Sequence, residues 1–386
     1  MSPRVVGMSS AHPSSPTATT GPVHVIGTGL LGASVGLALT RAGVAVSLAD
    51  ASPSQVALAR DLGAGELGAG EDARIVVVAV PPDVTADVVV DALRAHPTAI
   101  VTDVASVKSV VLAELHAAVA DGRLTPDDLT RYVGSHPMAG RERSGAAAAD
   151  PDLFSGRPWV LVPHPTSDPG GVLAVRTLAV DLGGALVTLA AQEHDDAVAA
   201  VSHAPQVLSS LLAARLLDAP EQALALAGQG LRDVTRIAAS DPRLWAAILV
   251  GNAGPVAHLL GQVRDELAEL VTALEAAAEH GPLTPGAMAA ASAAVSRGNQ
   301  GVARIPGKHG GVRRSYAEVT VLVPDTPGSL GRLFAQVGEL GVNIEDFAME
   351  HAPQQKVGLA TVSVLPEVAE ELEAGLDARG WRVVRS

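Results

Sequence analysis

The chain has 386 residues, of which 48% are hydrophobic and 18% charged, enough for two or three domains with ordinary cores. Its formal net charge of −14 excludes a nucleic acid as partner, because phosphate binding needs clustered lysine and arginine. The absence of cysteine excludes a disulfide framework, thiol chemistry and a cysteine-ligated metal, and it agrees with residence in the cytoplasm.

The first segment, residues 1–21, is rich in Ser, Thr and Pro. It lacks an apolar run as long as the core of a signal peptide, so we expect a disordered tail. The longer apolar runs, such as residues 75–80, are too short to span a bilayer and are typical of buried strands. We therefore expect a soluble cytoplasmic protein without a membrane partner.

A glycine-rich turn follows the first predicted strand. The strand Val23-His24-Val25-Ile26 meets Gly27-Thr28-Gly29-Leu30-Leu31-Gly32, and residues 34–42 follow a helical pattern. In such a unit the first glycine permits the tight turn, the second lets a pyrophosphate approach the backbone, and the third lets helix and strand pack closely. The unpaired N–H groups of the helix N-terminus then face the phosphates. We assign dinucleotide binding to Gly27, Gly29, Leu30, Leu31 and Gly32.

Asp50 ends the second predicted strand, residues 44–49. A carboxylate about twenty residues beyond the glycines can hydrogen-bond both ribose hydroxyls, which indicates NAD as the cofactor. An NADP enzyme would place Arg or Lys just after this strand, but Ala, Ser and Pro follow it here. The alternative is that Asp50 caps a helix or a turn.

Three further strands are predicted at residues 74–80, 99–102 and 159–163, and we expect them to extend a parallel sheet. Ligands bind at the carboxyl ends of strands in such sheets. Four residues lie at these ends and join the predicted cofactor site: Val80, Pro81, Asp103 and Ser106. Ser106 is also suited to cap the helix that follows it. The pattern closes this domain, an α/β Rossmann-like dinucleotide-binding domain over residues 22–190.

A histidine, His136, lies between Gly134 and Pro137, about a hundred residues after the glycine turn. With an ordinary pKa near 6.5, an imidazole can act as the acid or base that accompanies hydride transfer. Segments rich in Gly and Pro form surface loops that carry functional sites, so we favour a catalytic histidine over a core histidine.

Residues 134–145 read Gly-Ser-His-Pro-Met-Ala-Gly-Arg-Glu-Arg-Ser-Gly. Ten of the twelve match the segment Gly-Ser-His-Pro-Met-Ala-Gly-x-Glu-x-Ser-Gly, and in this the chain resembles the prephenate dehydrogenase (TyrA) family. Residues 103–108 are similar to the family's Asp-x-x-Ser-Val-Lys segment. The resemblance implies oxidative decarboxylation of prephenate to 4-hydroxyphenylpyruvate with reduction of NAD, in tyrosine biosynthesis. It implies that His136 accepts the proton of the ring hydroxyl and that Ser106 hydrogen-bonds this histidine and the hydroxyl.

Three other functions stay open. An arogenate dehydrogenase carries out the same chemistry on a substrate with an amino group in its side chain. A non-catalytic amino-acid sensor can keep a nucleotide fold, although the retained Ser106, His136 and Arg236 speak against it. A 3-hydroxyacid or imine reductase normally uses a lysine on a helix as its acid, and no such motif stands out.

Residues 191–285 follow a helical pattern with Ala and Leu repeats, and we expect an all-α substrate and dimerisation domain. His194 and His203 lie nine residues apart on what reads as one long helix broken at Pro205. Without a third ligand at helical spacing we expect no metal there. These positions resemble those near the family's substrate mouth, where many members carry a second histidine in place of Gln206.

The resemblance continues through residues 230–245. In the family the arginine of the Thr-Arg-Ile-Ala run binds the ring carboxylate, which implies Arg236, because a guanidinium fork matches a carboxylate bidentately. Arg232 is the competing choice, and Trp245 either lines the pocket or packs in the core. The implied substrate residues are Arg236, His203, Gln206, Trp245 and Glu142. The family dimerises through this region, so we expect a homodimer.

Residues 286–313 are rich in Gly, Ala, Ser and Pro, and we expect a connector. Its clustered glycines and cations can bind an anion or dock domains, and the sequence does not choose between these.

Residues 314–386 follow the predicted order βαββαβ. With its Asp-x-Pro-Gly-x-Leu turn and a Gly-Val-Asn segment, this part resembles an ACT domain, a ferredoxin-like module that binds amino acids at paired interfaces. The resemblance implies tyrosine as effector and a site formed by Asp325, Gly328, Leu330 and Asn343, with coupling between two sites. A purely structural dimerisation module is the alternative.

Overall fold

The computed structural model describes residues 17–140, 145–306, 316–351 and 357–384. The chain forms two compact units, one up to Val263 and the other from Arg264 onward. This division falls within a helix, earlier than the predicted boundary after residue 285.

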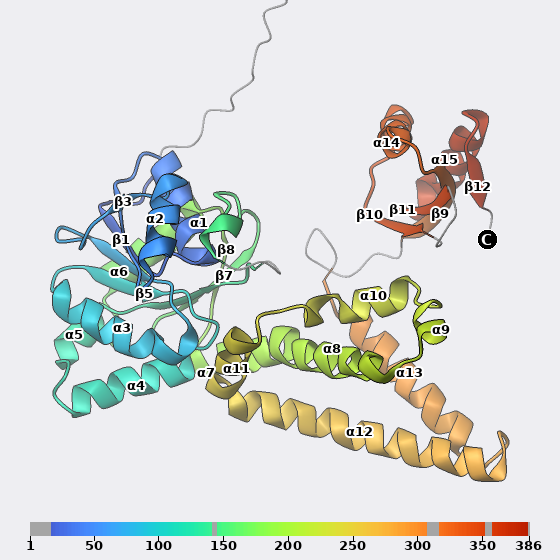
Figure 1. Cartoon of the computed structure of the whole chain (residues 1–386), viewed down its shortest axis with the longest axis horizontal. Coiled ribbons are helices and arrows are strands. Elements are labelled where there is room, and N and C mark those ends of the chain that lie inside the picture. Colours follow the sequence, from blue (N-terminus) through green and yellow to red (C-terminus); the bar gives the residue numbers. More distant parts are fainter. Residues whose placement is uncertain (1–16, 141–144, 307–315, 352–356, 385–386) are drawn as a thin grey trace, which may run out of the picture. The chain divides into compact units, whose positions relative to one another are not determined.

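A five-stranded parallel sheet is the centre of the first unit, with strand order β3-β2-β1-β4-β5 (Figure 1). Its strands are β1 (Val23–Ile26), β2 (Val46–Ala49), β3 (Glu66–Leu67), β4 (Ile75–Val78) and β5 (Ile100–Asp103). The order reverses between β1 and β4, and the carboxyl ends of these two strands are the expected place for a ligand in an open α/β sheet.

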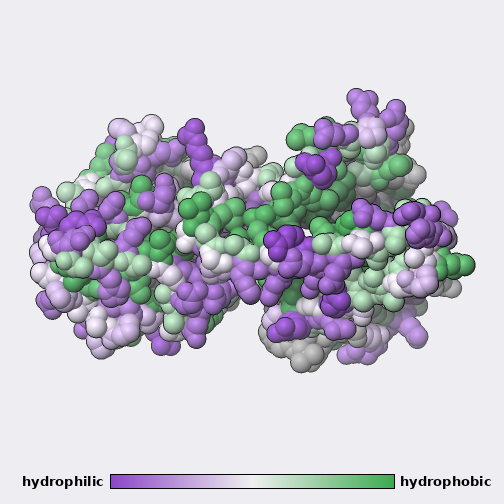
Figure 2. All heavy atoms as spheres, turned by 90° about the horizontal axis from the view of Figure 1, so that it is seen from below, coloured by the Kyte–Doolittle hydropathy of each residue, from purple (hydrophilic) through white to green (hydrophobic). Residues whose placement is uncertain are grey.

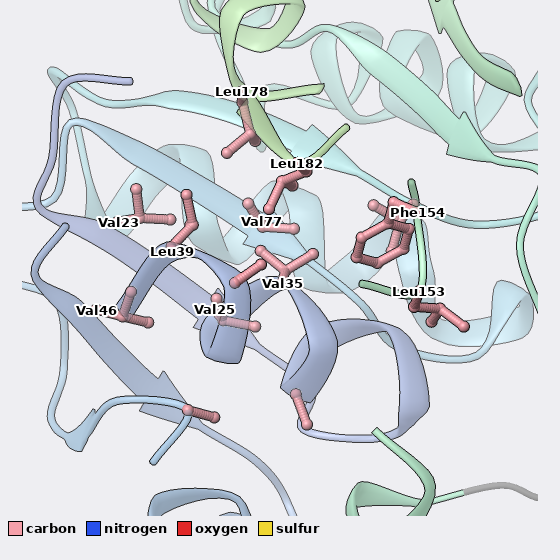
Figure 3. Packing of buried hydrophobic residues seen from close by; sticks show 14 of the residues in the cluster. Val23, Val25, Val35, Leu39, Val46, Val77, Leu153, Phe154, Leu178 and Leu182 are labelled. Carbon is pink, nitrogen blue, oxygen red and sulfur yellow. The ribbon is translucent and has the colours of Figure 1, made fainter. Parts of the chain in front are cut away.

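Helices cover both faces of this sheet because its inner strands are apolar on both sides. Val77 packs into one core and Val76 and Val78 into the other, as the two-residue period of a strand requires. Figure 3 shows the first core, where Val35 and Leu39 of α1 meet the valines of β1. The helices are α1 (Leu30–Arg41), α2 (Pro53–Asp61), α3 (Pro82–Ala95), α4 (Ser109–Ala120), α5 (Pro126–Thr130) and α6 (Pro169–Asp181).

The strand predicted at residues 159–163 does not join the parallel sheet as expected. It is β7 (Pro158–Val162), the middle of a three-stranded sheet with β6 (Gly134–Pro137) antiparallel to it and β8 (Ala185–Thr188) parallel. Only one isolated bridge, from Val101 to Tyr132, connects the two sheets among the described residues. The segment around His136, predicted as a loop, is therefore a strand, because pairing with β7 satisfies its backbone.

The predicted disordered tail ends earlier than residue 21. The backbone N–H groups of Ala18 and Thr19 donate to the Asp181 carboxylate at the end of α6, at 3.0 and 2.6 Å. A carboxylate that accepts backbone donors holds this part of the segment in place. Residues 1–16 lie outside the described residues.

The glycine turn between β1 and α1 has the geometry that its sequence predicts. Gly27 has a φ of +94°, which favours glycine, and a Cβ there would approach the Ala79 carbonyl oxygen to 2.4 Å. A Cβ at Gly32 would lie 1.9 Å from the Gly27 carbonyl oxygen. Gly29, in contrast, has no atom within 4 Å of the Cβ position and is open.

The helical part of the first unit continues from β8. One run, residues 191–218, begins with α7 (Ala191–Val198) and continues as α8 (Ala204–Ala214), with a π turn at Ala199–His203 between them. The remaining helices are α9 (Glu221–Leu224), α10 (Gln229–Thr235), α11 (Pro242–Gly251) and α12 (Ala253–His280), of which only the part up to Val263 belongs to the first unit.

By length and hydropathy alone, residues 191–218 could span a membrane, and α11 with α12 passes the same test as a pair bent by 95°. These are weak indications among the described residues. The first run carries buried His194, Asp195 and His203, whose side chains form hydrogen bonds inside the fold. A core helix has the same composition, so the run needs no bilayer to explain it.

In the second unit, helix α13 (Ala287–Ala303) occupies most of the predicted connector, which corrects that prediction. Alanine-rich sequence has high helix propensity, which outweighs the two glycines inside the helix, Gly298 and Gly301, and both prolines of residues 281–286 lie before it.

The carboxy-terminal elements keep the predicted βαββαβ order. They are β9 (Ala317–Pro324), α14 (Ser329–Glu339), β10 (Asp346–His351), β11 (Val357–Val364), α15 (Pro366–Ala378) and β12 (Arg382–Val384). They form an antiparallel sheet of order β10-β11-β9-β12, with α14 and α15 packed on its core.

We predict that Gly32→Ala destabilises the protein by about 1–3 kcal/mol or more, because the added methyl overlaps a backbone oxygen that cannot move away. Gly29→Ala is the matched control: its φ of −68° suits alanine and its surroundings are open, so the urea midpoint should hardly change. Equal unfolding midpoints for the two variants would contradict this account of the turn.

Candidate active site

A pocket of about 590 Å³ opens at the carboxyl ends of β1, β4 and β5, between the sheet and the helical part of the first unit. Three groups of residues line it: the glycine turn with the end of β4, the segments that follow β5 and β6, and the helices from the π turn to α11. Its walls include Gly29, Leu30, Leu31, Val80, Pro81, Ser106, His136, His203, Asp241 and Trp245.

His136 is held in this pocket by a chain of hydrogen bonds. It sits on β6 with only 7% of its surface exposed, and its Nδ1 lies 2.8 Å from His194 Nε2. The other ring nitrogen of His194, Nδ1, lies 2.8 Å from the Asp195 carboxylate. Both partners come from α7, so the helical part of the unit orients a side chain of the sheet.

The Asp195 carboxylate also caps helix α4. The backbone N–H groups of Lys108 and Ser109 donate to its two oxygens at 2.9 and 2.8 Å. The helix has no cap from its own side chains, so Asp195 satisfies its N-terminal donors from another element. Burial alone would raise the pKa of Asp195, but hydrogen bonds from His194, Ser109 and Lys108 outweigh it and lower that pKa.

The charge of Asp195 determines where the histidine protons lie. An ionised carboxylate only accepts, so His194 donates from Nδ1. When Nδ1–H is the only N–H of the His194 ring, its Nε2 accepts a hydrogen bond from His136 Nδ1–H. The lone pair of His136 is then on Nε2, which has no hydrogen-bond partner among the described residues, in a side chain that lines the pocket.

The pocket keeps His136 neutral. Burial, together with the nearby His194, Lys108 and His203, lowers the pKa of His136 well below its ordinary value. At neutral pH this imidazole is therefore a free base with its lone pair available, the state that a proton acceptor needs.

His203 is the second histidine of the pocket. It ends the π turn, is 1% exposed, and lies edge-on to Trp245 with ring centres 6.1 Å apart. Its Nδ1 is 3.1 Å from Asn252 Nδ2, which also donates to the Asp195 backbone carbonyl at 2.7 Å. Burial lowers the pKa of His203 to about 4.

The structure brings six of the predicted cofactor residues to the pocket wall: Gly29, Leu30, Leu31, Val80, Pro81 and Ser106. Gly27 and Gly32 shape the turn behind them. Asp50 does not line the pocket; its carboxylate accepts the Thr28 N–H at 2.6 Å, the Thr28 hydroxyl at 2.9 Å and the Ser52 N–H at 2.8 Å. It thus fixes the turn, and as a half-buried carboxylate it keeps lone pairs for a further donor.

Asp103, predicted to bind the cofactor, is instead structural. Its side chain is fully buried, forms an ion pair with buried Lys108, and accepts hydrogen bonds from the Tyr132 hydroxyl at 2.7 Å and the Ala105 N–H at 2.8 Å. A carboxylate without exposed surface cannot touch a ligand in the pocket. The strand-end position was the basis of the prediction, but this side chain turns inward to neutralise Lys108.

The substrate residues that the resemblance implies, together with Ser106, fall into four groups. Trp245, His203 and Ser106 line the pocket, although no hydrogen bond joins Ser106 to His136 among the described residues. Gln206 is buried beside it and bonded to the Ser240 hydroxyl at 3.2 Å, while Arg236 lies exposed on the short helix Arg236–Ala238 outside the lining. Glu142 lies outside the described residues.

Sequence reasoning missed Asp195, Asn252 and the direct contact of His194 with His136. The adjacent residues Glu193-His194-Asp195 were the one available signal, since a carboxylate next to a histidine often orients it. Asn252 gave no signal, because an asparagine after a helix reads as a cap residue.

The fold and the site define a dinucleotide-dependent enzyme with a buried histidine in the lining of its pocket and a helical second domain. The family models for the prephenate dehydrogenase nucleotide-binding domain and dimerization domain match residues 35–188 and 190–282. The chain is 35% identical over 364 residues to the Streptomyces niveus protein named "Probable prephenate dehydrogenase NovF", covering 92% of this chain and 98% of that one. The chain belongs to the prephenate dehydrogenase family.

Two solved structures are similar over 72% of this chain. The Aquifex aeolicus prephenate dehydrogenase in complex with hydroxyphenyl propionate and NAD+ has 26% identity, a TM-score of 0.61 and 97% of its own length covered. The Synechocystis arogenate dehydrogenase has 26% identity, a TM-score of 0.57 and 99% of its length covered. The NovF alignment leaves fewer residues uncovered than the segment 314–386 contains, so it reaches into the carboxy-terminal elements.

The buried histidines make stability depend on pH. The unfolded chain binds a proton on each imidazole near pH 6.5, whereas folded His203 binds one only near pH 4. Below about pH 6.5 the unfolded state therefore binds more protons than the folded state, and the free energy of unfolding falls as the pH decreases. We predict a urea midpoint that declines from pH 7 to pH 5, and a shallower decline in His203→Gln. Identical slopes for the two proteins would contradict the low pKa.

Proposed function

We propose that the protein catalyses the oxidative decarboxylation of prephenate to 4-hydroxyphenylpyruvate with reduction of NAD, in tyrosine biosynthesis. The observation that carries this proposal is the His136–His194–Asp195 chain, which leaves a lone pair at the wall of a pocket that the glycine turn also lines. Family membership supplies the substrate, because prephenate dehydrogenases are its named members.

The residues around the turn fit NAD. The α1 N-terminus has no side-chain cap, so its N–H groups are available to a pyrophosphate, and the open space at Gly29 lets the phosphates approach. Asp50 offers a carboxylate for ribose hydroxyls, and no lysine or arginine follows it to meet a 2′-phosphate. Bound NAD supplies the hydride acceptor of the reaction.

In this reaction His136 Nε2 accepts the proton of the ring hydroxyl while the hydride leaves the carbon that bears it. The ring then loses carbon dioxide, becomes aromatic and regains one proton on its oxygen. We assign to Ser106, which is half-buried in the lining of the same pocket, a hydrogen bond to the hydroxyl. The hydrogen bond between His136 Nδ1 and His194 Nε2 keeps the His136 ring in one orientation. The base therefore needs no reorganisation when the proton is transferred.

Substrate anchoring is proposed for Arg236, Gln206, Trp245 and Glu142. Trp245 forms the wall beside His203, and Gln206 follows His203 by three residues, one helical turn away. Arg236 and Glu142 are supported by the family resemblance alone, because neither is among the described residues that line the pocket. Arogenate is the second candidate substrate, because Gln206 replaces a histidine of many members and an arogenate dehydrogenase has a similar structure.

We propose a cytoplasmic homodimer. The second family model is described as a dimerization domain, and helices of the matched region expose large apolar side chains. Figure 2 shows apolar residues (green) among polar ones (purple) on the visible surface. Among the exposed ones in this region are Val201, Leu211, Leu217, Leu226, Val234 and Val250. A second copy would remove this surface from water.

We further propose that the carboxy-terminal sheet is an ACT regulatory module with tyrosine as effector. Its βαββαβ order and antiparallel sheet support this. The proposed effector residues do not converge within one module, however. Asp325, Gly328 and Leu330 lie beyond the Pro324 end of β9, whereas Asn343 precedes β10, whose first residue pairs near the Ala317 end. The strand between these ends spans about 20 Å, so a complete site requires two modules.

The reaction is tested by comparing prephenate with arogenate, each under NAD and then NADP. We expect the highest kcat/KM with prephenate and NAD. His136→Asn should lower kcat about 10²- to 10⁴-fold, because the proton acceptor is lost, while the dissociation constant for NAD stays the same. A higher kcat/KM with arogenate would show that the proposed substrate is wrong. Unchanged turnover in His136→Asn would contradict the proposed role of this histidine.

The regulatory proposal is tested by titration calorimetry of tyrosine into the whole protein. We expect saturable heat that is lost in Asp325→Ala and, because the site spans two modules, also in Asn343→Ala. Both side chains are exposed, so neither change should alter the thermal midpoint. The absence of heat at millimolar tyrosine would leave the module a structural role only.

A further inference from the structure

Asn252 is buried between Asp195 and His203, although nothing in the sequence or the family resemblance indicated a role for it. It follows α11 directly and is 2% exposed. Its amide nitrogen donates to the Asp195 carbonyl oxygen at 2.7 Å and lies 3.1 Å from His203 Nδ1.

These two contacts fix the orientation of the amide. A backbone carbonyl oxygen only accepts hydrogen bonds, so the atom of Asn252 that faces it must be the nitrogen. The same nitrogen has a second proton, which points at His203 Nδ1. Nδ1 is therefore the acceptor, and the single proton of a neutral His203 is on Nε2.

We propose that Asn252 is a positioning residue that presents His203 to the pocket as a hydrogen-bond donor, through Nε2–H, for an oxygen of the substrate. The identity of that substrate rests on the proposed function. Prephenate offers only acceptor oxygens in its two carboxylates and its ketone, so a donor is the group that this wall needs. The edge-on contact with Trp245 holds the same ring from a second side.

His136 and His203 thus have opposite roles in one pocket. His136 carries its proton on Nδ1, toward His194, and presents a lone pair. His203 accepts a hydrogen bond at Nδ1 from the Asn252 amide and presents the proton on its Nε2. The charged and titratable groups around His203 are His194, Asp195, His136 and Asp241, of which His136 and Asp241 line the same pocket. As a neutral donor, His203 keeps the same charge throughout the neutral pH range.

Asn252→Asp reverses the hydrogen bond and gives the sharpest test. A carboxylate at this position accepts a hydrogen bond from His203 Nδ1–H and raises the pKa of His203. At low pH the imidazolium still has a proton on Nε2, but once it deprotonates the remaining proton stays on Nδ1 and the donor is lost. We expect KM for prephenate to be nearly independent of pH between 6 and 8.5 in the wild type and to rise with pH, about tenfold, in Asn252→Asp, with kcat changing less.

Ser209→Ala is the matched control. Ser209 is buried on α8 and donates to the Val234 carbonyl at 2.7 Å, so its loss removes one buried hydrogen bond without a contact to His203. Its KM should show the pH dependence of the wild type. The same pH-independent KM in a folded Asn252→Asp variant would overturn the proposal.

A measurement without substrate separates this inference from the proposed function. In protein labelled with ¹⁵N-histidine, His203, assigned by its absence in His203→Gln, should show an unprotonated Nδ1 and a protonated Nε2 at pH 7. A protonated Nδ1 would refute the role of Asn252 whatever the substrate is. If the tautomer is as proposed and prephenate is not oxidised, only the proposed function fails.

Discussion

The carboxylate of Asp195 is the interaction on which the site depends. It is buried, and a buried charge is stable only when hydrogen bonds replace the water that it has lost. Its donors come from two directions, the N-terminus of α4 and the ring of His194, so one ion connects the nucleotide-binding sheet to the helical part of the unit. Loss of a single partner of such a buried ion costs about 3–5 kcal/mol, more than the hydrogen bond itself contributes.

Residue 195 acts on both histidines, through its side chain and through its backbone. Through His194, the carboxylate determines which ring nitrogen of His136 carries the proton. The backbone carbonyl determines the orientation of the Asn252 amide, which in turn determines the protonated nitrogen of His203. Because both connections start from the same residue, the base and the donor are held at a fixed separation.

The parts of the site that could be predicted are those with a local cause. The glycine turn follows from Gly27 and Gly32, where a side chain would overlap the backbone, and those contacts involve only neighbouring strands. The strand at Gly134–Pro137 could not be predicted, because Gly, Ser, His and Pro have no strand preference and its partner β7 lies more than twenty residues away. Asp103 could be taken for a cofactor-binding residue because it ends a strand. Its side chain instead forms an ion pair with buried Lys108, five residues later. Local sequence patterns do not predict how side chains from elements distant in the sequence are oriented toward one another.

The π turn at Ala199–His203 places one extra residue between His194 and His203 in an otherwise continuous helix. Each residue turns an α-helix by about 100° and advances it by about 1.5 Å. The insertion therefore sets the angle at which α8 continues from α7, and with it the side from which His203 enters the pocket while Asp195 still faces α4. Insertions and deletions are normally tolerated in loops, but here a one-residue change in a helix would turn one histidine away from the other. The length of this turn is as much a part of the site as its side chains.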